Sequence, residues 1–437
     1  MCRLSRDGTL GVLCRFAAAA LFALVLLVAG TAGAQARSDL DARVDALTTR
    51  QLLTRNPAGL VNAGRQIRAR KIADLRHAAS TGWGIVQILA FWWLWRSGNA
   101  ARLRDVMRRR TRSRIAQRAV FGAVLGALGP IVALPFALVS YRVVFNAGLT
   151  DERLPQWFLD YAVRVGLDAL LGAVVVAGVL ALVERARLWY LVVAGAILAG
   201  AVASVALAPV VPFGMPHKAT PNALAALAVP LAQRIGVPGT PVVLLASARH
   251  SNALNARAAG IGPTARALVG DVVLDHMTPP EQRVVLALTL AHVRFGDPLR
   301  QTLLAVVLFV LSAAIAVLLS DRVGFRRDDD ALSRLALVAT YLGLVLIVTY
   351  PIYNGYARNV ETRADQTALA ATGDRAATVR AMVRYADDDL VPLCDRRTIR
   401  WYFDDRSALG GRIAEAAGTA DPCPGGSPAA SPQPTTR

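Results

Sequence analysis

Residues 278–297 read Thr-Pro-Pro-Glu-Gln-Arg-Val-Val-Leu-Ala-Leu-Thr-Leu-Ala-His-Val-Arg-Phe-Gly-Asp and predict a helix that runs to about Phe295. Thr278 followed by Glu281 is a typical helix start, and proline suits the first turn. The helix is largely apolar and contains one histidine, His292. A lone histidine on an apolar helix is usually a packed core residue, so His292 by itself indicates no chemistry.

The composition of the whole chain around this helix indicates a membrane protein. It has 437 residues, 54% of them hydrophobic, and a mean hydropathy of +0.42. Apolar runs near the length of a bilayer-crossing helix predict six spans. They are Gly82–Trp95, Ala119–Val139, Val165–Val183, Leu188–Val211, Thr302–Leu319 and Leu335–Tyr350.

The formal net charge of +19 comes mostly from arginines between these runs. The arginine-rich segments at 102–118, 184–187 and 322–327 alternate as cytoplasmic loops under the positive-inside rule, so nucleic-acid binding is not needed to explain the charge. Segments 212–300 and 353–437 are then extracytoplasmic. We expect an integral protein of a bacterial-type inner membrane, with the lipid bilayer and no nucleic acid as partner.

The two ends of the chain have their own patterns. Residues 1–36 are a signal peptide with an Ala34-Gln35-Ala36 cleavage site, or else an uncleaved first span. Residues 417–437 are rich in proline and serine and predict a disordered tail. Cys394 and Cys423 have no C-x-x-C spacing, and they are available for a disulfide if this region is extracytoplasmic.

The polar segment before the helix predicts two short strands, at Pro241–Leu245 and Ala267–Leu274. Together with the helix, this segment resembles the gluzincin metallopeptidases of the CAAX prenyl protease type, which carry H-E-x-x-H on this helix. Alignment on His292 places Leu288 at the first histidine and Thr289 at the glutamate. The trailing Gly-His of the family reads Gly296-Asp297 here.

Further motifs extend the resemblance over roughly residues 82–415. Asn252 and Ala253 match the edge strand that holds the substrate, Glu361 matches the glutamate that is the third zinc ligand, and Asp365 matches an aspartate that orients the site. A His-Pro pair of the family is replaced by Arg406-Ser407. The resemblance implies a mainly helical, multi-span protein that encloses a chamber and carries a small zincin-like α+β domain.

Combined with the spans, the resemblance implies a sequence of regions. After the leader at 1–36 comes a polar segment at 37–81. An N-terminal membrane domain with four spans follows at 82–211, and then a peptidase-like domain at 212–300, two further spans at 301–353, the C-terminal part of the peptidase-like domain at 354–416, and the tail at 417–437.

The family's chemistry needs residues that this chain lacks. Two histidines four apart share a helix face and can both bind one zinc, while the glutamate activates the zinc-bound water. Leu288 offers no lone pair, and Thr289 is no carboxylate base. Only His292 and Glu361 are left as metal ligands, where catalytic zinc normally has three from the protein. His250 or His276 would have to supply the third.

We therefore expect a pseudopeptidase that binds peptide or protein segments by strand addition near Asn252 and Ala253, without cleaving them. Zinc is implied by the resemblance but has an incomplete ligand set. The alternative is an active zinc metalloendopeptidase with an unconventional ligand set. A transporter or channel is a third reading, but Asp160 and Asp168, its ionisable residues, lie near span ends.

Overall fold

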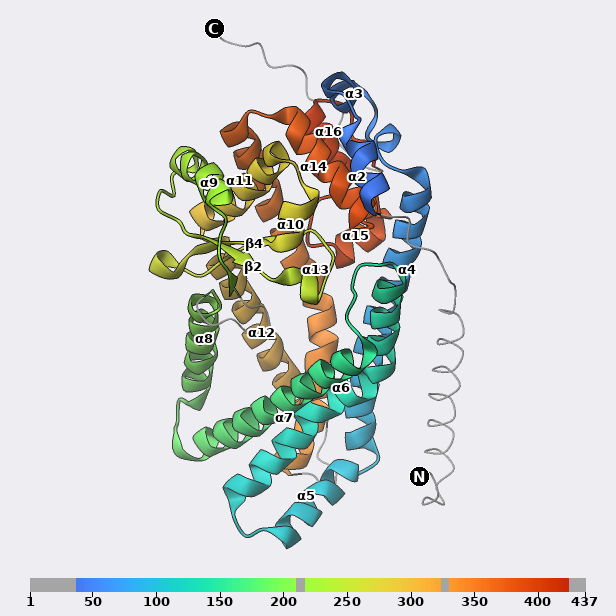
Figure 1. The fold of residues 1–437 in the computed structure, drawn as a ribbon. Coiled ribbons are helices and arrows are strands. Elements are labelled where there is room, and N and C mark those ends of the chain that lie inside the picture. Colours follow the sequence, from blue (N-terminus) through green and yellow to red (C-terminus); the bar gives the residue numbers. More distant parts are fainter. Residues whose placement is uncertain (1–36, 210–216, 324–329, 424–437) are drawn as a thin grey trace.

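The computed structural model describes residues 37–209, 217–323 and 330–423, and within them the chain is mainly helical with one small mixed sheet (Figure 1). The expected leader at 1–36 lies outside the described residues. The helices are α2 (Arg37–Asp45), α3 (Thr49–Thr54), α4 (Ala63–Arg96), α5 (Asn99–Arg110), α6 (Arg114–Asn146), α7 (Leu154–Arg185), α8 (Trp189–Leu207), α9 (Asn222–Ile235), α10 (Asp271–His276), α11 (Pro279–Phe295), α12 (Asp297–Arg322), α13 (Ala331–Thr372), α14 (Arg375–Asp388), α15 (Arg397–Phe403) and α16 (Leu409–Ala417).

Five of these helices, α6, α7, α8, α12 and α13, are long and apolar enough to cross a membrane. The most apolar windows of α7 and α8 bury none of their residues inside the protein. Their apolar side chains therefore face outward, where only lipid could cover them.

The sixth expected span, Gly82–Trp95, does not meet the same measure. It is the second half of α4, whose first half is polar and basic. Its fourteen residues rise about 21 Å at about 1.5 Å per residue, which is short of the roughly 30 Å hydrocarbon core. The segment is nevertheless helical and packs against α6 and α13.

The arginine-rich segments at 102–118 and 184–187 lie at one end of the helices, opposite the sheet (Figure 1). Arg108 on α5 binds Asp330 at the start of α13 at 2.7 Å, and Arg118 on α6 binds Glu184 at the end of α7. These ion pairs join the loops that the sequence assigns to one side of the membrane.

At the opposite end, a four-stranded sheet has the order β1-β2-β4-β3 (β1 His217–Lys218, β2 Val242–Leu245, β3 Ala256–Ala259, β4 Arg266–Gly270). β2 and β4 are parallel, and β1 and β3 are antiparallel edge strands. The expected strand at Pro241–Leu245 is thus present. The expectation for Ala267–Leu274 is wrong in its second half, because the chain enters α10 at Asp271. A short apolar run does not distinguish a strand from a helical turn.

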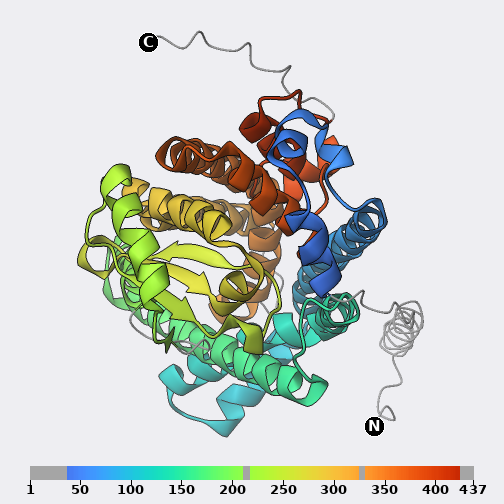
Figure 2. The ribbon, with the colours of Figure 1, turned by 45° about the horizontal axis from the view of Figure 1, so that its top comes forward.

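Helix α11 lies between the sheet and α14 (Figure 2). Its buried side chains, among them Leu286 and Leu290, share a core with α9 and the sheet. Helix α13 also contacts α11. Because α13 runs unbroken for 42 residues through Pro351, one rigid element carries both a membrane segment and the residues around Glu361.

The polar residues 37–81 fold onto this domain instead of forming a separate unit. Leu52 and Leu60 pack in one core with α14 and α16. Arg384 of α14 is 1% exposed and binds Glu281 of α11 at 2.9 Å and Asp41 of α2 at 2.7 Å. This buried charge cluster fastens α2 to two helices that lie far from it in sequence.

A disulfide joins Cys394 to Cys423, which confirms the pairing that the sequence left open. Its half-cystines close a loop around α15 and α16. Part of the expected tail, residues 417–423, is therefore held in the fold, and Cys423 is 4% exposed. The remainder of that tail lies outside the described residues.

Removing this disulfide should lower the free energy of unfolding. A cross-link with a sequence separation of 29 restricts the unfolded chain by about 3–4 kcal/mol. We expect the double variant Cys394→Ala/Cys423→Ala, or the wild type after reduction, to melt at a clearly lower temperature in detergent. The double variant serves as the control, because a reductant should leave its melting temperature unchanged. Equal melting of reduced and oxidised wild type would contradict the expectation.

Candidate functional site

Helix α11 presents His292 near its C-terminal end. Thr278 and Glu281 form the expected capping box at its start, and Gly296, with φ of 62°, ends it. Glycine adopts this left-handed conformation without the penalty that a Cβ brings. The turn places Asp297, the first residue of α12, beside the His292 ring.

The structure brings the two expected metal ligands together. His292 Nδ1 lies 2.9 Å from Asp297 Oδ2, and His292 Nε2 lies 3.6 Å from Glu361 Oε1. Asp297 is 1% exposed and also accepts a hydrogen bond from Arg363. A carboxylate on one ring nitrogen is the arrangement that orients metal-binding histidines. Asp297 thus holds the ring so that its other nitrogen faces Glu361.

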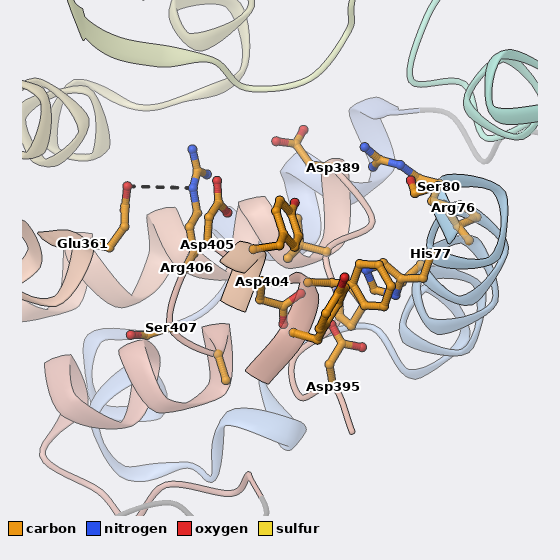
Figure 3. A pocket seen from close by; sticks show the side chains of 18 of the residues that line it. Arg76, His77, Ser80, Glu361, Asp389, Asp395, Asp404, Asp405, Arg406 and Ser407 are labelled. Carbon is orange, nitrogen blue, oxygen red and sulfur yellow. Dashed lines mark ion pairs between the residues drawn. The ribbon is translucent and has the colours of Figure 1, made fainter. Parts of the chain in front are cut away.

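Two arginines flank Glu361. Arg412 donates two hydrogen bonds of 2.6 Å to Asp365 and approaches Glu361 Oε2 to 3.9 Å. Arg406 Nε lies 3.9 Å from Glu361 Oε1 (Figure 3). Burial lowers the pKa of Arg412, but Asp365 and Glu361 outweigh it and raise that pKa, so the guanidinium stays charged. Arg412 therefore links Asp365 to Glu361.

Leu288 and Thr289, at the positions of the family's first histidine and glutamate, supply neither a metal ligand nor a carboxylate base. Thr289 is 2% exposed and donates its hydroxyl to the Val285 carbonyl at 2.8 Å. Leu288 packs against the core and lines the adjacent cavity. With Leu288 in place of the first histidine and two arginine cations within 3.9 Å of Glu361, the residues present do not fit a catalytic zinc.

Neither extra histidine repairs the site. His276 Nδ1 lies 2.8 Å from Asp41 Oδ2 on α2. His250 lies beside Glu152 and Asp160, at the start of α7. Neither residue lines the cavity at His292.

Asn252 and Ala253 lie just before the edge strand β3, not within it. The Asn252 side chain donates to Asp151 at 2.8 Å and to the Gly148 carbonyl at 3.3 Å, so it is tied to the loop between α6 and α7. The strand that is free to accept a partner begins at Ala256. Asn255 and Ala256 line the cavity, so the cavity reaches the edge of the sheet.

A cavity of about 1240 Å³ adjoins this site and extends between α4 and α13. It exceeds the roughly 300–1,000 Å³ of ordinary small-molecule pockets. Figure 3 shows Glu361 and Arg406 toward one end and Arg76, His77 and Ser80 of α4 at the other. Toward the membrane the walls are apolar, with Ile88, Leu346 and Ile347 among the lining residues.

One wall of the cavity is acidic. Asp395, Asp404 and Asp405 all line it. Burial, together with the charges of Asp395 and Asp405, raises the pKa of Asp404 to about 7. Burial also raises the pKa of Asp395 and lowers that of His77, whose Nδ1 has no hydrogen-bond partner among the described residues. A cation brought by a ligand would stabilise this wall.

Sequence reasoning missed several residues of this site. Asp297 was noted only as a departure from Gly-His, although an acidic residue five positions after a histidine at a glycine helix end could have suggested a contact. Asp404 and Asp405, which directly precede Arg406, carry no motif that assigns them a role. Tyr385 also lines the cavity, and burial raises its pKa to about 12. It belongs to no motif identified from the sequence.

Comparisons with known proteins agree with this geometry. The model of peptidase family M48 matches residues 218–424, and the model of the CAAX prenyl protease N-terminal region, described as five membrane helices, matches residues 69–213. The crystal structure of S. mikatae Ste24p superposes with a TM-score of 0.69 and 15% identity, over 86% of this chain and 95% of that chain. At this identity the likeness shows the fold alone. A search of curated proteins finds no match.

Proposed function

Because the chain belongs to peptidase family M48 and carries the membrane region of CAAX prenyl proteases, we propose that it is a membrane-embedded pseudopeptidase, which captures peptide or protein segments without cleaving them. The observation that carries the proposal is the pairing of His292 with Glu361 at 3.6 Å beside Leu288 and between two arginines. The family's fold is retained, while the groups that would bind zinc and activate water are absent.

The cavity and the edge of the sheet support capture. β3 pairs with β4 on one side only, and no other described strand covers its outer edge. An extended segment could add to β3 by main-chain hydrogen bonds and continue into the cavity. There the apolar walls between α4 and α13 would take apolar side chains, and Asp395 and Asp404 would take basic ones.

The peptidase-like end is placed outside the cytoplasm in this proposal. The arginine-rich segments at 102–118 and 184–187 lie at the opposite end, as the positive-inside rule requires for the cytoplasmic side. The disulfide between Cys394 and Cys423 is of the kind that persists in oxidising compartments. Both features favour an extracytoplasmic chamber.

The proposal is tested with the detergent-purified protein and a fluorescent peptide of alternating lysine and leucine. We expect binding, measured by fluorescence anisotropy, and recovery of the intact peptide by mass spectrometry, with zinc or with a chelator present. Cleavage that requires zinc and is lost in His292→Ala would overturn it and support the alternative, an active endopeptidase with an unconventional ligand set. No binding of this peptide, of a glutamate–leucine peptide or of unlabelled competitor proteins would refute capture.

Capture of the lysine peptide should strengthen as the pH rises through about 7. Asp404 gains its negative charge across its pKa of about 7, whereas peptide lysines stay protonated up to about pH 10. One added ion pair in the cavity corresponds to up to about tenfold in Kd. Asp404→Asn should flatten this pH profile, and Asp275→Asn, at an exposed position outside the cavity, should not. An unchanged profile in Asp404→Asn would exclude this contact.

A further inference from the structure

Three metal-binding side chains converge at a place that the peptidase-like site does not use. One ligand atom from each of Glu152, Asp160 and His250 lies within 4.8 Å of the others. Glu152 precedes α7, Asp160 lies in its second turn, and His250 follows the short 3-10 turn Ser247–Arg249. It is the one group of this kind within residues 37–209, 217–323 and 330–423. The cluster therefore spans the junction between the membrane helices and the sheet domain.

The two segments that supply these side chains are clamped to each other. Thr150 is 5% exposed, donates its hydroxyl to the His250 carbonyl at 2.8 Å and accepts the Glu152 N–H at 3.1 Å. The Asn252 N–H donates to the Leu149 carbonyl at 2.9 Å. His250 and Glu152 are consequently fixed relative to one another by their backbones before any ion binds.

Each of the three residues, or the turn beside it, is also held by a hydrogen bond to a residue outside the cluster. Tyr141 donates its hydroxyl to the Glu152 carbonyl at 2.8 Å, and Gln156 donates to Asp160 Oδ1 at 3.0 Å. The turn before His250 is anchored by Asp271, whose Oδ1 accepts from Ser247 Oγ and from the Ala248 N–H, both at 2.9 Å. Supporting contacts of this type commonly surround metal ligands.

The cluster brings two carboxylates together. Glu152 and Asp160 each place a carboxylate oxygen within 4.8 Å of the other and of a His250 ring nitrogen. Two adjacent carboxylates repel each other when both are ionised. A divalent cation would relieve this repulsion, and the imidazole of His250 favours a transition metal over calcium or magnesium.

We propose that Glu152, Asp160 and His250 form a site for a zinc-class divalent metal ion that clips the membrane helix α7 to the peptidase-like domain. Three protein ligands and a water complete a tetrahedral zinc shell. Ligand distances of about 2.0–2.2 Å put neighbouring donor atoms about 3.3 Å apart. Side-chain rotations that draw the donors together by roughly 1–1.5 Å are enough to reach this geometry. The site is independent of the proposed function in the cavity.

The test is titration of the metal-stripped, detergent-purified full chain with Co²⁺, read by its visible absorption, and with Zn²⁺ in competition. We expect about one ion per chain and at least about tenfold weaker binding in His250→Ala and in Asp160→Asn. Asp160 is exposed, so its variant should fold normally. Zinc should also raise the melting temperature of the wild type and leave that of both variants unchanged.

Two controls separate this site from others. His276→Ala removes a different partly exposed histidine, and His292→Ala/Glu361→Ala removes the pair in the cavity; both should bind cobalt like the wild type. The proposal is overturned if the wild type binds no ion, if His250→Ala and Asp160→Asn bind as well as the wild type, or if the ion is lost with His292 and Glu361 instead. Peptide capture is measured separately, so neither result decides the other.

Discussion

Replacing Leu288 with histidine, in a His250→Ala background, should create a zinc site between α11 and α13. Residues 288 and 292 lie one helical turn apart on the same face, and both line the cavity with Glu361. The variant would supply two imidazoles and a carboxylate, the ligand number that catalytic zinc requires. The His250→Ala background removes the ion expected at the α7 junction, so any bound zinc reports the cavity alone.

The gain in zinc affinity should be at least about a hundredfold. Loss of a residue that merely orients a ligand costs about 10–100-fold, so a restored direct ligand should contribute more. Arg406→Ser should strengthen binding further by removing a cation that lies 3.9 Å from Glu361. Thr289→Glu is the matched control, because it adds a carboxylate on the same turn without adding a ligand. Elemental analysis after gel filtration measures the stoichiometry.

Adding Thr289→Glu to the Leu288→His variant tests whether restoring the general base at position 289 restores cleavage. A general base contributes about 10²- to 10⁴-fold in rate, so zinc-dependent cleavage of the lysine–leucine peptide should appear only in the combined variant. If Leu288→His bound no zinc, α11 and α13 would not hold these positions in ligand geometry. The pairing of His292 with Glu361 would then be a structural contact only.

The sequence predicted the elements whose signals are local. The capping residues and Gly296 predicted where α11 begins and ends, and the long apolar runs predicted the five helices that are able to cross a membrane. The order of motifs predicted that His292 and Glu361 would meet, although 69 positions separate them in the sequence numbering. That prediction came from the family resemblance, because helix periodicity fixes the face that a residue occupies but not which distant helix packs against it.

What the sequence did not predict depends on contacts between distant segments. Nothing local in Asp41 or Arg384 indicates that they bind, because a charged residue on a helix is usually a solvated one. The convergence of Glu152 and Asp160 on His250 depends on how a loop between membrane helices docks on the sheet domain. The predicted span Gly82–Trp95 is helical as the second half of α4, but α4 does not meet the measure of length and hydropathy that identifies the five other spans.

Replacing Arg384 with methionine should destabilise the fold more than any other single change at a charged residue in the peptidase-like domain. Arg384 Nε lies 2.9 Å from Glu281 Oε1, and the two side chains are 1% and 0% exposed. Burial lowers the pKa of Arg384, but Glu281 and the α2 carboxylates outweigh it and raise that pKa. Methionine fills similar volume, so the variant isolates the loss of charge and of hydrogen bonds.

The expected cost is about 3–5 kcal/mol in the free energy of unfolding, because Glu281 would be left buried without a cation. Glu281→Gln/Arg384→Met should recover part of it, since the remaining amide can still accept the hydrogen bonds that Thr278 donates to Glu281. The matched control is Arg380→Met, one turn earlier on α14. Arg380 donates to the Leu47 carbonyl and has no carboxylate partner within the described part of the chain, so its loss should cost about 1 kcal/mol.

Denaturant unfolding in detergent measures these differences, and limited proteolysis locates them. Arg384 also binds Asp41 and Asp45, so its loss should free α2 and expose residues 37–45 to protease before the rest of the domain opens. If Arg384→Met were as stable as Arg380→Met, the buried pair would contribute no net stability. If it were destabilised while α2 stayed protected, the helix would be held by contacts other than Arg384, such as Arg43 with Asp387 and the apolar packing of Val44.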